Sequence, residues 1–146
     1  MIGYYNYTVI LTYVSLLSSA IGIFLCAIGE PVAAVFCLMA SGFCDMFDGK
    51  VARTKKNRSE SEKKFGIQID SLCDVVCFGV LPSIIGYSVG MHSWCDLPIL
   101  LMFPTCAVIR LAYFNVAEEE RQKKTSETRK TYEGLPVTSV ALILPL

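Results

Sequence analysis

Four aspartates are the residues of this sequence whose type and spacing are best suited to chemistry. Asp45 and Asp48 are three residues apart, and Asp70 and Asp74 are four residues apart. Residues at these spacings lie on one face of a helix, so each pair would present two carboxylates together. Carboxylate oxygens are the ligands that hard cations such as Mg²⁺ take. The two pairs therefore predict a metal site, provided that their helices pack against each other.

The segments that hold these aspartates are strongly apolar. The chain has 146 residues, of which 53% are hydrophobic and 18% charged, and the apolar residues occur in blocks. Residues 7–28 contain no charged side chain, and about 20 apolar residues span a membrane. We therefore expect an all-α integral membrane protein with one domain over residues 1–146. The expected helices cover about 6–28, 31–54, 65–91 and 97–117, and a fifth helix starts near Leu135. Charged connections cover 55–64, which could include a short amphipathic piece, and 118–134.

The fifth expected helix is short. The final segment "LPVTSVALILPL" has room for only about 18 Å of helix, which is less than a membrane crossing. We therefore expect the chain to be truncated at its C-terminus.

The basic residues predict the orientation in the membrane. All thirteen lysines and arginines lie between residues 50 and 130, and basic residues mark the cytoplasmic side. The two charged connections are separated by two spans, so they should share a side. We expect the N-terminus and the aspartates at the cytoplasmic face, with His92 and Trp94 at the opposite interface.

Packing the second expected helix against the third would bring four carboxylates together. Their repulsion and desolvation cost a few kcal/mol each at the edge of the hydrocarbon, and two divalent cations would offset that cost. Gly49, Gly66 and Ala52 lie on the carboxylate faces. They could serve close helix packing, or they could leave room for a nucleotide. Local pairing of the aspartates with basic residues is the simpler alternative.

The cysteines offer a second set of metal ligands. They form no CxxC pair, so we expect them to be small buried hydrophobic residues. The seven are Cys26, Cys37, Cys44, Cys73, Cys77, Cys95 and Cys106.

Two stretches together resemble a known signature. "DMFDGKVAR" followed by "GIQIDSLCD" is similar to D-x2-D-G-x2-A-R, a spacer and G-x3-D-x3-D of the CDP-alcohol phosphotransferase family. The spacer, residues 54–65, is longer than the usual one of about eight residues. The resemblance implies a membrane enzyme with a six-helix core, usually a homodimer, which uses a CDP-linked lipid and releases CMP.

The resemblance also implies roles for individual residues. The metal ligands for two Mg²⁺ or Mn²⁺ ions would be Asp45, Asp48, Asp70 and Asp74. Asp74 would also be the base that deprotonates the acceptor hydroxyl. The CDP-lipid would contact Gly49, Ala52, Arg53, Gly66 and Thr12.

The regions downstream look like the phosphatidylserine synthase branch of this family. The similar stretches are "FGIQIDSLCDVVCFGVLPS", "RLAYFNV" and "YEGLPVTS". Tyr113, Thr138 and Ser15 differ from the branch pattern. The branch implies CDP-diacylglycerol as donor and L-serine as acceptor, with Arg110 and Asn115 as acceptor-binding residues. Arg110 could instead extend toward the interface or pair with an aspartate. The other partner is the bilayer, and no nucleic acid is expected.

Several other functions are compatible with parts of this pattern. Within the same chemistry, the alternative acceptors are glycerol 3-phosphate, inositol phosphate or another alcohol such as an amino-alcohol. An acceptor that carries a phosphate would require a dense basic pocket, whereas the spans offer only Arg110. A cation transporter would place its carboxylates near the bilayer midplane. A soluble aspartate-rich prenyl-type enzyme would not have the uncharged residues 7–28. A truncated, inactive membrane scaffold is the remaining alternative.

Overall fold

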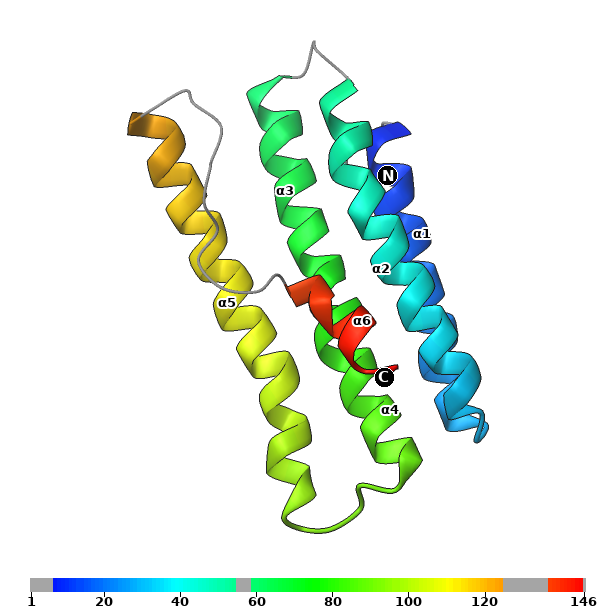
Figure 1. Cartoon of the computed structure of the whole chain (residues 1–146). Helices are drawn as coiled ribbons and strands as arrows, with labels where there is room; N and C mark the ends of the chain where they lie inside the picture. Colours follow the sequence, from blue (N-terminus) through cyan, green and yellow to red (C-terminus); the bar gives the residue numbers. More distant parts are fainter. Residues whose placement is uncertain (1–6, 55–58, 125–136, 146) are drawn as a thin grey trace.

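A computed structural model gives the fold of the chain (Figure 1). It describes the backbone of residues 7–54, 59–124 and 137–145, and the side chains of 9–47, 59–120 and 138–145. Every element in these ranges is helical, which confirms the predicted all-α class. The elements are α1 (Tyr7–Ala27), α2 (Pro31–Thr54), α3 (Glu60–Asp74), the π-helix η1 (Val75–Val80), α4 (Leu81–Val89), α5 (Asp96–Lys124), the 3₁₀ turn η2 (Val137–Ser139) and α6 (Val140–Ile143).

Three helical segments have the length and apolar composition to cross a membrane. They are Val9–Ala27, Glu60–Val89 and Asp96–Glu120, and the described apolar part of α2, Pro31–Phe47, is shorter. The chain is a multi-span integral membrane protein. Figure 1 shows the start of α1, the end of α2, the start of α3 and the end of α5 at one end of the bundle. The described parts of the two predicted charged segments, residues 59–64 and 118–124, therefore lie at the same end, as expected.

The span Glu60–Val89 is one helix with an irregular middle. It begins earlier than predicted because Ser59 forms a capping box: its Oγ accepts from the Glu62 N–H, and the Glu62 carboxylate accepts from the Ser59 N–H. Residues 60–64, predicted as connection, are thus helical. The π-helix η1 follows α3, and the Leu81 N–H bonds to the Val76 carbonyl, five residues back. Pro82 comes next and has no N–H, so the regular hydrogen-bond ladder cannot run through this point.

Helix α5 is also longer than predicted. It continues to Lys124, so the prediction that residues 118–124 belong to a connection was wrong. Pro104 lies inside α5 and has no N–H for the carbonyl four residues back, that of Leu100. The Ser83 hydroxyl on α4 lies 2.8 Å from this carbonyl oxygen and 2.9 Å from the Gly79 carbonyl oxygen, four residues back on its own span. The Ser83 hydroxyl of the neighbouring helix therefore offers a donor to the Leu100 carbonyl, which Pro104 leaves without its usual partner.

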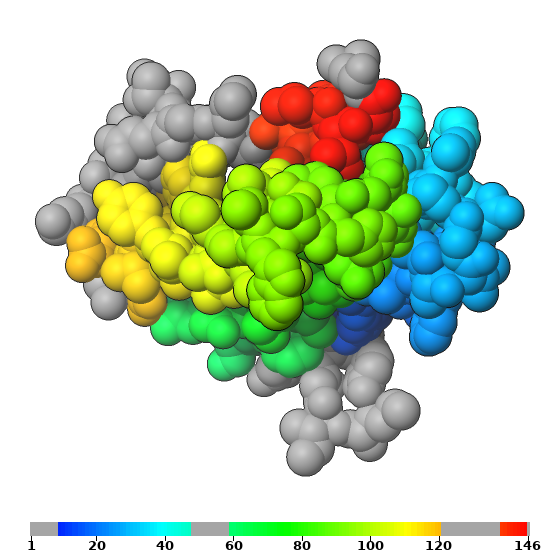
Figure 2. Space-filling view, turned by 90° about the horizontal axis from the view of Figure 1, so that it is seen from below, coloured from blue at the N-terminus to red at the C-terminus, as the bar shows by residue number. Residues whose placement is uncertain are grey.

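The core of the bundle lies where α1, α2, η1, α4 and α6 meet. Its fully buried members include Leu38, Phe78 and Leu81. The short α6 packs on α2, where a Cβ at Gly42 would stand 2.6 Å from the Ala141 Cβ. Seen from the end with the α4–α5 connection, α6 lies beside α4 and the α1–α2 hairpin (Figure 2). The predicted start of a helix near Leu135 lies outside the described residues.

Candidate metal centre and its surroundings

Three of the four predicted aspartates come together in the bundle. Asp45 of α2 and Asp70 and Asp74 of α3 each offer a carboxylate oxygen, and these atoms lie within 4.8 Å of one another. All three residues are half-buried. Asp48 falls within α2, but its side chain lies outside the described residues. The helix pairing that the spacing required is therefore present for the described members.

The geometry of this acidic cluster suits a hard cation. Bonds of about 2.1 Å in an octahedral shell place neighbouring and opposite ligand oxygens about 3 to 4 Å apart. The carboxylate oxygens of the cluster lie within 4.8 Å of one another, which is close to these distances. Three carboxylates from two helices thus fit at least one divalent ion.

The depth of the cluster follows from helix geometry. The segment Glu60–Val89 has 30 residues, which correspond to about 45 Å of helix, whereas the hydrocarbon core is about 30 Å thick. With Val89 taken as the opposite boundary, counting about 20 residues back places Asp70 at the hydrocarbon boundary and Asp74 one turn inside it. This register does not place the aspartates near the bilayer midplane, where a cation transporter would require them.

Gly66 has an open surface at the position where a ligand could approach. A Cβ added there would meet no described atom within 4 Å. By contrast, Cβ atoms at Gly22, Gly79 and Gly86 would meet atoms of a neighbouring helix at 2.8–3.1 Å. Close helix packing was one of the two explanations offered for Gly66, and no described residue makes the contact that it would require. Gly49, Ala52 and Arg53 lie on α2, but their side chains are outside the described part of the chain.

Thr12 lies on the buried face of α1 and is 5% exposed. It precedes by one turn Ser15, whose Oγ is 2.7 Å from the Ser41 Oγ of α2. Because α1 and α2 are antiparallel, this register places Thr12 at the level of residues 44 and 45. The predicted CDP-lipid residue on α1 therefore lies at the height of the acidic cluster.

The two predicted acceptor residues occupy different surroundings on α5. The Asn115 Nδ2 donates to the Ser71 Oγ at 2.9 Å, so Asn115 is tied to the residue that follows Asp70. The guanidinium of Arg110 lies over the Phe114 ring, with its carbon 5.4 Å from the ring centroid. Within the described part of the chain Arg110 forms no ion pair, so pairing with an aspartate is not observed there.

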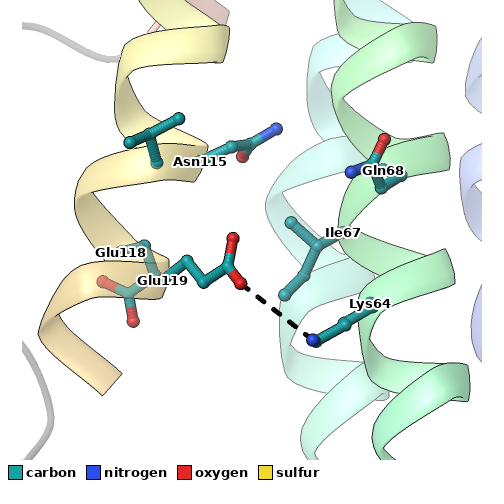
Figure 3. A pocket seen from close by; sticks show the side chains of 7 residues that line it. Lys64, Ile67, Gln68, Asn115, Glu118 and Glu119 are labelled. Carbon is teal, nitrogen blue, oxygen red and sulfur yellow. Dashed lines mark ion pairs between the residues drawn. The ribbon is translucent and has the colours of Figure 1, made fainter. Parts of the chain in front are cut away.

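A pocket of about 180 Å³ opens between α3 and α5 beside Asn115. Its polar lining is of mixed charge, and the Lys64 Nζ lies 4.0 Å from the Glu119 carboxylate (Figure 3). The lining residues are Lys64, Ile67, Gln68, Asn115, Val116, Glu118 and Glu119. Of these, only Asn115 was predicted from the sequence. Lys64, Glu118 and Glu119 were missed because both flanking helices are longer than predicted, although the capping box at Ser59 was a readable signal. Ile67, Gln68 and Val116 lie within the predicted helices, but their meeting depends on how α3 packs against α5.

The described cysteines play no part in the acidic cluster. Cys26, Cys73 and Cys77 are buried, as expected for small hydrophobic residues, whereas Cys95 and Cys106 are exposed. No disulfide joins any of the seven in the structure described here.

The comparison with protein families agrees with the fold and the cluster. Residues 5–146 match the CDP-alcohol phosphatidyltransferase family, and the chain belongs to this family. Similar proteins in several organisms carry the name CDP-diacylglycerol–serine O-phosphatidyltransferase. The one from Saccharomyces cerevisiae is 42% identical over 106 residues, which are 70% of this chain and 37% of that protein.

Two bacterial relatives with the same name extend this likeness. The Helicobacter pylori protein (strain 26695) is 31% identical over 97% of this chain and 56% of its own length. The Bacillus subtilis protein is 31% identical over 77% of this chain and 58% of its own length. The chain therefore spans between about a third and three-fifths of the length of these relatives. The search of solved structures found no significant match.

Proposed function

We propose that this chain forms the catalytic region of a phosphatidyltransferase that transfers a phosphatidyl group from CDP-diacylglycerol to the hydroxyl of L-serine. The convergence of Asp45, Asp70 and Asp74 within 4.8 Å is the observation on which the proposal rests. Family membership supports the donor, and the names of the relatives support the acceptor. The product would be phosphatidylserine, with CMP as the leaving group.

The residues would divide the work of the reaction. Asp45, Asp48, Asp70 and Asp74 would hold two Mg²⁺ or Mn²⁺ ions, which when bound neutralise and orient the diphosphate. Asp74 would accept the proton of the serine hydroxyl, whose oxygen attacks the lipid-side phosphorus. The bond from that phosphorus to the bridging oxygen breaks, and CMP carries the oxygen away.

The donor would lie along the open face beside the acidic cluster. Gly49, Ala52 and Gly66 would let the nucleotide approach the helix backbones, and Arg53 would pair with phosphate oxygens in a two-pronged contact that lysine cannot reproduce. Thr12 would contact the same molecule from α1. A diphosphate at the hydrocarbon boundary leaves the acyl tails in the bilayer, which accounts for aspartates at the end of an apolar helix.

The pocket between α3 and α5 favours a zwitterionic acceptor. Lys64 can attract a carboxylate, and Glu118 or Glu119 can attract an ammonium group, whereas two acids would repel an acceptor that carries a phosphate dianion. Asn115 lies at the inner side of this pocket and bonds to Ser71. Arg110 is the other candidate for the serine carboxylate; it lies five residues, or about 7.5 Å, deeper along α5 than Asn115, so it would take this role in place of Lys64. We further propose that the site faces the cytoplasm, because the basic segments lie at the same end, and that the protein acts as a homodimer.

The test is CMP release from CDP-diacylglycerol by the full-length chain in detergent with Mg²⁺ or Mn²⁺. L-Serine, glycerol 3-phosphate and inositol phosphate are compared as acceptors. Asp70→Asn should abolish release. Asp96→Asn is the matched control, because Asp96 accepts from the Ser93 N–H at the opposite end of the bundle. Release with another acceptor would overturn the serine assignment, and full release by Asp74→Asn would overturn its role as the base.

A further inference from the structure

A buried set of hydroxyl and thiol groups lies immediately below the acidic cluster. The Ser15 Oγ of α1 is 2.7 Å from the Ser41 Oγ of α2 and 3.6 Å from the Cys77 Sγ of η1. The Ser19 Oγ is 2.9 Å from the Ser41 Oγ. We refer to these four residues as the hydroxyl network. It joins three helical elements that are distant in the sequence.

The protons of the hydroxyl network can be assigned so that each is used once. Ser41 donates to the Ser15 carbonyl at 3.0 Å, Ser15 and Ser19 donate to the Ser41 Oγ, and the Cys77 thiol donates to the Ser15 Oγ. The four side chains are between 0% and 3% exposed. A buried polar group left without its partner costs about 1–3 kcal/mol. The network therefore specifies one relative placement of α1, α2 and η1.

The position of the network along the helices relates it to the acidic cluster. Ser41 precedes Asp45 by four residues on α2, and Cys77 follows Asp74 by three residues at the junction of α3 and η1. Both distances are about one helical turn, or 5.4 Å. The network thus lies one turn deeper than the cluster on both helices that supply aspartates, and Ser15 bridges the two.

We infer that the hydroxyl network positions the Asp45 and Asp74 carboxylates for divalent cation binding, an inference that rests on the proposed function. Carboxylates that face each other repel when no cation is bound. Mg²⁺ requires near-ideal octahedral geometry, so a small sliding of α2 against η1 misplaces a ligand oxygen. Hydrogen bonds one turn away resist that sliding without touching the ions. Ser15, Ser41 and Cys77 are accordingly positioning residues.

The chain offers a matched control for this inference. The Ser18 Oγ donates to the Cys37 carbonyl at 3.0 Å, which also joins α1 to α2. Cys37 lies four residues before Ser41, one further turn from Asp45. Ser18→Ala and Ser41→Ala therefore each remove a serine hydroxyl from the same helix interface, but only Ser41→Ala removes one adjacent to the cluster.

The experiment measures Mn²⁺ binding by electron paramagnetic resonance in detergent, without substrate, for the full-length chain and its variants. Mutation of a residue that orients a metal ligand typically weakens metal binding about 10- to 100-fold. Because the network acts through one helical turn, we expect Ser41→Ala to raise the Mn²⁺ Kd about five- to tenfold. Ser15→Ala should have a similar effect, and Ser18→Ala should change Kd less than twofold. Ser41→Cys retains a donor and should restore part of the affinity.

Equal Mn²⁺ Kd values in all variants, with similar losses of thermal stability, would overturn the inference and leave the proposed reaction intact. If Ser41→Ala does not fold, Ser15→Ala provides the same comparison, because it keeps the Ser19–Ser41 bond. CMP release is measured separately. Network-dependent Mn²⁺ binding without CMP release for any acceptor would support the inference and overturn the proposed reaction.

Discussion

Replacing Gly66 by alanine should make the protein more stable and less active. A Cβ at this position meets no described atom within 4 Å, so the change in stability should come from helix propensity alone. Glycine in a helix costs about 1 kcal/mol relative to alanine. We therefore expect Gly66→Ala to raise the free energy of unfolding by roughly 0.5–1 kcal/mol.

The loss of activity has a separate cause. If the nucleotide lies against the backbone at Gly66, the new methyl group occupies space that the donor needs. Overpacking at a close contact costs about 1–3 kcal/mol, which corresponds to a decrease of about 5- to 150-fold in kcat/KM for CDP-diacylglycerol. The two assays are thermal unfolding in detergent and CMP release at varied donor concentration, with L-serine saturating.

Gly79→Ala is the matched control on the same span. Its Cβ would stand 3.1 Å from both the Pro104 Cα and the Ala107 Cβ, so it should destabilise the protein by about 1–3 kcal/mol. An unchanged kcat/KM for Gly66→Ala would refute the assignment of its open face to the donor. A loss of stability in that variant would show that the face is covered.

Three further predictions follow from contacts between and within the helices. Ser83→Ala should lower the unfolding free energy by about 0.5–1.7 kcal/mol, the range of hydrogen bonds between membrane helices. This loss should be smaller in a Pro104→Ala background, because residue 104 then has an N–H for the Leu100 carbonyl. An equal loss in both backgrounds, measured by a double-mutant cycle, would argue against this pairing. Ser59→Ala should lower the free energy of unfolding by about 1 kcal/mol, because α3 loses its N-cap. Hydrogen exchange across Glu60–Lys64 should become faster, and unchanged exchange there would contradict the role of the capping box. Gly42→Ala should loosen α6 from α2, since the Ala141 Cβ is only 2.6 Å from the new Cβ, and should speed proteolysis near residue 141; unchanged cleavage there would show that the contact is dispensable.

The sequence predicted the helical class and the convergence of Asp45, Asp70 and Asp74 because both depend on simple periodicity. Uncharged blocks long enough to span identify the membrane helices, and spacings of three and four identify the faces of α2 and α3. The ends of the helices were predicted less well. Residues 60–64 and 118–124 are charged, and a charged helix that extends beyond the membrane has the same composition as a solvated connection.

The contacts between helices were not accessible from the sequence. The hydroxyl network depends on the register of α1 against α2, which no spacing within either helix determines. The hydrogen bond from the Ser83 hydroxyl to the Leu100 carbonyl depends in the same way on how α4 packs against α5. The pocket beside Asn115 requires both helix extensions at once. Local periodicity gives the face of a helix, whereas tertiary packing decides which residues of two faces meet.

The π-helix Val75–Val80 has a consequence for how this span tolerates changes in length. One residue corresponds to about 100° of rotation in an α-helix. Six residues of π-helix, at about 4.4 residues per turn, rotate the chain by about 490°, and five residues of α-helix rotate it by about 500°. Deleting a single residue within this segment, with conversion to regular α-helix, would therefore leave the half that holds Asp70 and Asp74 in nearly the same orientation relative to the half that holds Leu81 and Ile85. The π-turn thus accommodates one additional residue, and a chain one residue shorter here could still align both halves.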